Sequence, residues 1–162
     1  MTGKKAIQDV VEFCHMVTGG YVADLTDADL MVRCVPGANH IAWQLGHLIG
    51  SDHHMLSALG HTPPQLPEGF VESHGKEAAS SDDAAGFCTK NEYLTLTEQM
   101  KDAKLAAIEA TADESLTQPG PEAMRQYAPT IGAVLTLLGT HWLMHAGQFV
   151  PIRRKIGKPH MF

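Results

Sequence analysis

Apolar residues recur at helical spacing in four separate stretches of the chain. In the first stretch, AIQDVVEFCHMV, they fall at positions 7, 10, 11, 14 and 17, on one face of an amphipathic helix that Gly19 and Gly20 are expected to end. A second helix is predicted from about His40 to Leu59, because its apolar residues recur in the same way and Gly60 follows them. No stretch alternates apolar and polar residues in the manner of a β-strand, so the pattern predicts an all-α protein.

The second half of the chain contains the other two helical patterns. One, from about Asp82 to Thr111, combines good helix formers with a stripe of apolar residues. The other begins at Thr130, a capping residue directly before an apolar run, and is expected to reach about Ile156, with Gly157 at its end. Long connections between the first and second helices and between the third and fourth predict a four-helix bundle. The proline-rich segment 61–70 is expected to be an extended connection that crosses one end of the bundle.

The length and the charge of the chain limit the classes of protein to which it can belong. With 162 residues, 44% of them hydrophobic, the chain is expected to form one domain over residues 1–162. The net charge of -6 at pH 7 leaves no positive surplus for a nucleic-acid backbone, so no nucleic-acid partner is expected. A basic cluster at residues 153–158 is interpreted instead as cations that complement the dipole of a helix end.

Three features of the sequence bear on the compartment of the protein. Asp9 and Glu12 interrupt what would have to be the apolar core of an export signal. The longest strongly apolar stretch, residues 131–139, is far short of the roughly 20 residues that span a bilayer. The three cysteines form no C-x-x-C pair, which fits a reducing environment. We therefore expect a cytoplasmic protein without a membrane partner.

Ten histidines make metal chemistry worth testing, and two of them lie four residues apart in the predicted fourth helix. Residues at this spacing share a face with Cβ atoms about 5–6 Å apart, so His141 and His145 can bind one cation at Zn–N distances of about 2.1 Å. The helix is apolar on most sides, and two uncompensated imidazoles would cost on the order of 1–3 kcal/mol each, a cost that a shared metal ion removes. The alternative is that a packed helix tolerates two polar residues at these positions.

A catalytic metal site usually has three protein ligands and an open position, so a third ligand is needed. The second helix carries His40, His47 and His54 at intervals of seven residues, about 10.5 Å apart along its axis, so only one of them can join a given ion. His47 is the best candidate because it lies in the middle of the helix between two leucines.

Four more polar residues are candidates for the pocket or for contacts with the metal ligands: His40, Gln44, Ser51 and Gln148. Gln44 and Ser51 stand about one turn on either side of His47, although exposed positions would explain them equally well. His40 has a second interpretation as the residue that starts its helix. His74 lies in a predicted loop and is expected to be solvated.

Two stretches, NHIAWQLGHLIGSD and PTIGAVLTLLGTHWLMHAGQFVPIRRKIGKP, resemble the DinB-like superfamily of metal-dependent enzymes, four-helix bundles related to the bacillithiol and mycothiol S-transferases. In that family the histidine of the second helix and the two of the H-x-x-x-H motif bind a divalent metal, which carries over to His47, His141 and His145. The resemblance implies zinc or nickel first, iron or manganese next, and a homodimer. It also implies that a low-molecular-weight thiol is activated to attack an electrophilic small molecule.

The leading hypothesis is a metal-dependent S-transferase or a related hydrolase, in which the three histidines activate a thiol or water. An alternative is a non-catalytic metal-binding or stress-response bundle protein. A third possibility is a structural dimeric bundle whose histidines bind nothing. The sequence leaves the choice among these open, and it contains no feature that identifies the substrate.

Overall fold

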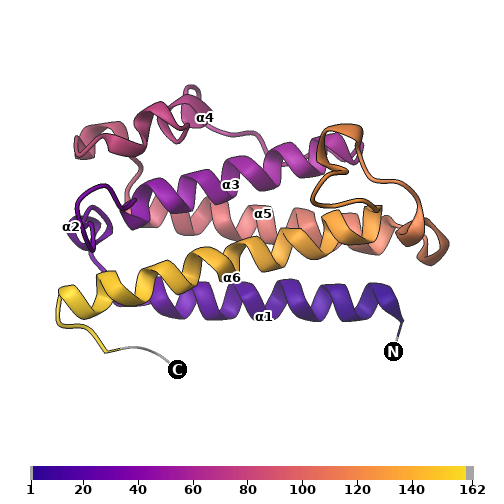
Figure 1. The fold of residues 1–162 in the computed structure, drawn as a ribbon, viewed down its shortest axis with the longest axis horizontal. Helices are drawn as coiled ribbons and strands as arrows, with labels where there is room; N and C mark the ends of the chain where they lie inside the picture. Colours follow the sequence, from indigo (N-terminus) through magenta and orange to yellow (C-terminus); the bar gives the residue numbers. More distant parts are fainter. Residues whose placement is uncertain (1, 160–162) are drawn as a thin grey trace.

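The computed structural model describes residues 2–159 of the chain. These residues form four long α-helices that lie side by side, together with two short α-helices and four short 3-10 helices (Figure 1). Their one β contact is an isolated bridge between Pro119 and Thr130. The all-α class predicted from the apolar pattern is therefore confirmed.

The long helices are α1 (Gly3–Ala23), α3 (Ile41–Ala58), α5 (Lys90–Ala110) and α6 (Ile131–Lys155), and the short ones are α2 (Asp27–Leu30) and α4 (Phe70–Ser73). The 3-10 helices span Glu77–Ser80, Ala84–Gly86, Asp113–Thr117 and Glu122–Met124. Both α3 and α6 match their predicted bounds closely. As expected, Thr130 caps α6, because its hydroxyl accepts a hydrogen bond from the amide of Ala133.

Two predicted helix boundaries were wrong. α1 continues through Gly19 and Gly20 to Ala23, because Tyr21 and Val22 are buried and hold its last turn in the core. α5 begins at Lys90 rather than near Asp82. Thr89 and Glu92 form a capping box there, in which each side chain satisfies the backbone amide of the other residue.

Cross-helix contacts fix the direction of each long helix. α1 and α6 run parallel, since Val11 lies against Gly139 and the carbonyl of Tyr21 accepts a hydrogen bond from Arg153. α5 runs antiparallel to α1, because its two ends contact opposite ends of α1. α3 is antiparallel to α6, so α3 and α5 are parallel to each other (Figure 1).

Because α3 and α5 are parallel, the chain must return along the length of the molecule between them. Residues 59–89 make this return and form the longest connection between the long helices. The connection does not simply cross one end, as predicted, but runs back beside α3 and packs α4 against it (Figure 1). The two connections that were predicted to be long, residues 24–40 and 111–130, are present but shorter.

The core lies between the four long helices. Large, fully buried apolar side chains come from α3, α5 and α6, among them Trp142, Tyr93, Phe149, Leu48, Ile49 and Met100. Gly139 lets α6 approach α1 closely, because a Cβ at this position would stand 3.1 Å from the Cα of Val11. No helix in residues 2–159 combines the length and the hydropathy needed to cross a bilayer.

The basic residues near the end of α6 form hydrogen bonds and ion pairs within the fold. Arg153 is fully buried and donates hydrogen bonds to the carbonyl of Tyr21 and to the carboxylate of Asp24. Lys158 also contacts Asp24, and the ammonium of Lys155 donates to the carbonyl of Arg33. These cations tie the C-terminal end of α6 to the segment that follows α1.

Candidate metal centre

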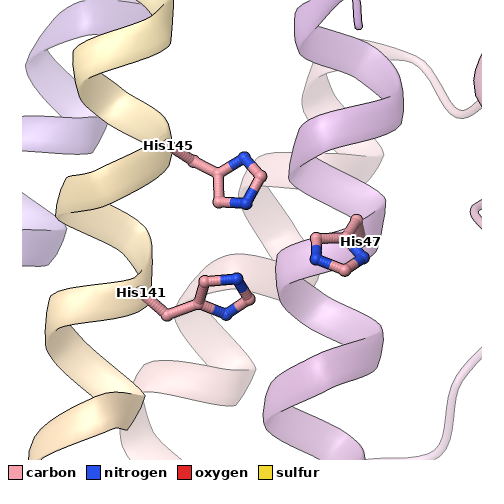
Figure 2. Close-up of side chains that lie close together, drawn as sticks. All are labelled: His47, His141 and His145. Carbon is pink, nitrogen blue, oxygen red and sulfur yellow. The ribbon is translucent and has the colours of Figure 1, made fainter.

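Three histidines from two helices meet at one point between α3 and α6. Figure 2 shows His141 and His145 on α6 turned toward His47 on α3. The ring centroid of His47 is 5.3 Å from that of His141 and 5.3 Å from that of His145. One ring nitrogen from each residue lies within 4.8 Å of the other two. Nitrogens that share a tetrahedral zinc ion stand about 3.4 Å apart, so this group is close enough to be a candidate metal site.

Packing within α3 fixes the plane of the His47 ring. His47 lies between the buried Leu45 and Leu48, and its ring stacks on that of Trp43 at a centroid distance of 4.9 Å and an interplanar angle of 6°. The indole N–H of Trp43 donates to the carbonyl of Gly75 at 2.9 Å, which anchors Trp43 in turn. The connection between α3 and α5 therefore holds Trp43 in place, and Trp43 in turn holds the His47 ring.

A hydrogen bond orients the imidazole of His145. Its Nδ1 lies 2.9 Å from Oε1 of Gln44 on α3, and the amide nitrogen of Gln44 donates to the carbonyl of Asn39 at 2.9 Å. The second bond requires the Gln44 amide oxygen to face His145, so Nδ1 of His145 carries the proton. The lone pair of Nε2 is then available for a metal ion.

Burial in an apolar setting keeps these histidines neutral. Desolvation lowers the pKa of His47, and it lowers the pKa of His141 to about 4, with further effects from the charges of His47 and Lys104. The pKa of His145 also falls to about 4, because of desolvation first and then the charges of the other two histidines. Neutral imidazoles are the form that binds metals, so the cluster needs no deprotonation at pH 7.

The cluster opens onto a hollow of about 370 Å³ between α3 and α6. Besides His47 and His141, this hollow is lined by Ser51, His54, Met55, Tyr127, Leu137 and Met144. Of the other candidates from the sequence, Gln148 is exposed on α6 and does not line the hollow. By contrast, Ser51 lies in the wall of the hollow, and Gln44 contacts His145.

His40 lies away from the cluster and caps α3. Its Nδ1 accepts a hydrogen bond from the amide of Trp43 at 3.1 Å, and its Nε2 lies 3.1 Å from the carbonyl of Ser81. Both ring nitrogens are therefore engaged in holding the start of the helix. This position matches the interpretation of His40 as a helix-start residue.

His74 was expected to be solvated, and this expectation was wrong. Its side chain is buried, with Nε2 2.6 Å from the hydroxyl of Tyr93 and Nδ1 2.7 Å from the carbonyl of Phe70. The ring lies directly against α3 at Gly46, where a Cβ would stand 1.9 Å from the ring. Gly46 on α3 and Tyr93 on α5, both distant in the sequence, help to bury His74, so no local signal could have predicted its burial.

A buried ion pair between α3 and α5 was not predicted from the sequence. The ammonium of Lys104 on α5 lies 2.6 Å from Oδ2 of Asp52 on α3, and both side chains are fully buried. The indole N–H of Trp142 donates to the same oxygen at 2.7 Å. His15 on α1 packs against Trp142 with a centroid distance of 4.6 Å, and its two ring nitrogens have no partner in the described residues.

Comparison with known proteins gives one match. The sequence model of the DinB superfamily matches residues 11–149 of the chain. This match includes α3, most of α6 and all three histidines of the cluster. No curated protein and no solved structure matches the chain.

Proposed function

Since this chain belongs to the DinB superfamily, we propose that His47, His141 and His145 bind a divalent metal ion and that the protein is a metal-dependent enzyme. The observation that carries the proposal is the convergence of the three imidazoles from two helices far apart in the sequence. The Gln44 contact supports it, because a carbonyl that fixes the tautomer of a histidine is a typical partner of a metal ligand.

The donor set favours some metals over others. All three donors are imidazole nitrogens, and in residues 2–159 no carboxylate or thiol joins the group. Imidazole suits zinc, nickel and iron, whereas manganese prefers oxygen ligands. We therefore propose zinc or nickel first, then iron, with manganese last.

The reaction that fits this site is the activation of a thiol or of water. His47, His141 and His145 would hold a divalent ion with room for one more ligand, and the ion, as a Lewis acid, would lower the pKa of a thiol or a water molecule bound there. The surrounding residues prepare the histidines for this chemistry. Gln44 orients His145, Trp43 holds His47, and the buried setting keeps the imidazoles neutral.

We propose that the substrate is a small molecule and that the chemistry is that of a thiol S-transferase or a related hydrolase. The hollow of about 370 Å³ beside the cluster supports a small-molecule substrate, because its volume lies within the range of ligand pockets. The choice of a thiol rests on the resemblance to the thiol S-transferases of the DinB-like superfamily. The proposed cytoplasmic location rests on the cysteine pattern and on the interrupted N-terminal apolar stretch.

A turnover experiment tests the proposed activity. Zinc-loaded and nickel-loaded protein would be incubated with a panel of low-molecular-weight thiols and chlorodinitrobenzene, and separately with a panel of esters. We expect metal-dependent turnover that His145→Ala abolishes. Equal turnover by the metal-free protein or by His145→Ala would contradict the proposal. Stoichiometric metal binding without turnover would favour the non-catalytic metal-binding alternative.

We also propose that the protein is a homodimer. Phe13 and Met16 on α1 and Leu143 on α6 are 54%, 57% and 39% exposed, and α1 and α6 pack against each other. Phe13 and Leu143 border a shallow hollow that Gly147 also lines. A patch of exposed apolar side chains around a hollow suits a two-fold interface, in which the same patch of both subunits is buried. Sedimentation equilibrium should give twice the 17.5 kDa mass of one chain.

A further inference from the structure

The walls of the hollow beside the histidine cluster are chiefly apolar. Met55 from α3 and Leu137 and Met144 from α6 line it, and Tyr127 reaches it from the connection between α5 and α6. Met144 and Tyr127 are 60% and 65% exposed, so two large side chains of the hollow stand open to solvent. Large exposed side chains beside a pocket often mark a surface that a ligand covers.

Among the described residues that line the hollow, none is an aspartate, glutamate, lysine or arginine. Outside the cluster, the side chains there that can form hydrogen bonds are those of Ser51, His54 and Tyr127. A carboxylate or phosphate placed against Met55, Leu137 and Met144 would give up part of its hydration without a fixed counter-ion beside it, which is unfavourable. An apolar group has no such hydration to lose, and its transfer from water to the apolar walls is favourable.

His47 and His141 supply the polar atoms at the end of the hollow next to the cluster. Ser51, whose hydroxyl makes no hydrogen bond to residues 2–159, and His54 continue this polar face along α3, one and two turns after His47. A ligand that fits has a polar end at the histidines and an apolar body between Met55 and Met144. Methionine side chains adapt to such bodies and make favourable contacts with aromatic rings.

We propose that the small molecule that reaches the cluster carries an uncharged, apolar group, such as an aryl or alkyl group, that occupies the hollow between Met55, Leu137 and Met144. This inference rests on the proposed metal site, because the polar end of the ligand is assigned to the metal ion. It names the class of substrate that the site selects. Met144 is then a residue that determines specificity.

Thiol probes on the cobalt-loaded protein test the inference. Cobalt(II) replaces zinc in histidine sites, and thiolate binding to it produces a charge-transfer absorption that can be titrated. Benzyl mercaptan supplies an uncharged aryl group, and 3-mercaptopropionate supplies a carboxylate in its place. We expect benzyl mercaptan to bind at least about tenfold more tightly, a difference equal to about 1.4 kcal/mol.

A matched pair of variants locates the effect. Met144→Lys places a cation at the hollow, and we expect it to reduce the preference for benzyl mercaptan about two- to fivefold, because the carboxylate of 3-mercaptopropionate gains a counter-ion at an exposed position. Val35→Lys changes an equally exposed apolar residue in the connection between α1 and α3, away from the hollow and from the proposed dimer patch, and should leave the preference unchanged.

Two kinds of failure are distinguishable. If cobalt binds stoichiometrically but the two thiols bind equally well, or if Met144→Lys behaves like Val35→Lys, the inference about the hollow is wrong and the metal site stands. If the protein does not bind cobalt, the proposed metal site and the inference fall together.

Discussion

Oε1 of Gln44 on α3 lies 2.9 Å from Nδ1 of His145 on α6. This contact joins the two helices that carry the histidine cluster, about one turn of α3 before His47. Because the Gln44 amide is itself fixed by the carbonyl of Asn39, the contact sets the tautomer and the orientation of His145 before any ion arrives. The protein therefore holds at least one proposed ligand in its binding form.

Loss of the Gln44 side chain should weaken metal binding without removing it. Gln44→Ala leaves Nδ1 of His145 without its acceptor, and changes of this type typically cost about 10-fold to 100-fold in metal affinity. The zinc dissociation constant, measured by competition with a chelator, checks the prediction. Gln148→Ala is the control, because Gln148 is an exposed glutamine on α6. Equal affinities in the two variants would contradict the role assigned to Gln44.

Two glycines of α3 should respond to alanine in opposite directions. At Gly46 a Cβ would stand 1.9 Å from the His74 ring, whereas at Gly50 nothing lies within 4 Å. Gly46→Ala should therefore lower the free energy of unfolding by about 1–3 kcal/mol. Gly50→Ala should raise it by about 0.5–1 kcal/mol, because alanine is the better helix former. Urea denaturation checks both, and a stable Gly46→Ala variant would show that His74 moves aside freely.

Breaking the buried ion pair between Lys104 and Asp52 should be costly. Lys104→Met leaves the Asp52 carboxylate buried with only the Trp142 N–H, and we expect the free energy of unfolding to fall by about 3–5 kcal/mol. Lys101→Met removes a partly exposed ion pair with Glu98 and should cost at most about 1 kcal/mol. The double variant Lys104→Met with Asp52→Leu should recover part of the loss. Equal losses in the two lysine variants would refute this account.

His15 should make the metal-free protein less stable in acid. Desolvation, with the charges of Lys104 and Lys101, lowers its pKa from 6.5 to about 2, so the folded protein holds fewer protons than the unfolded chain between these values. Stability is therefore lost as the pH falls below 6.5, by about 1.4 kcal/mol per pH unit from this residue. Between pH 7 and pH 5, His15→Leu should lose about 2 kcal/mol less than the wild type in urea denaturation. The same loss in both proteins would exclude the effect.

The sequence predicted what depends on spacing within one helix. The i, i+4 relation of His141 and His145, the place of His47 in the middle of its helix and the Thr130 cap all follow from helical geometry, and they appear in the structure. The early start assigned to α5 has a local cause too. The capping box of Thr89 and Glu92 is a readable local signal, and the predicted helix began too early because good helix formers also precede it, from residue 82 on.

The rest depends on which segments meet in space. Gln44 was selected only for its distance from His47 along α3, and its contact with His145 requires the packing of α3 on α6. His74 is buried because residues 59–89 return beside α3, a path that no local pattern specifies. The pairing of Lys104 with Asp52 joins two helices whose relative direction was unknown from the sequence.

The central claim is that His47, His141 and His145 hold one metal ion, and metal analysis of the purified protein tests it most directly. After expression with added zinc and nickel, we predict about one ion per chain in the wild type and in His53→Ala, which changes a histidine of α3 outside the cluster. His47→Ala and His141→Ala should both lose the ion. Less than about a tenth of an ion per wild-type chain, or full occupancy in His47→Ala, would contradict the claim.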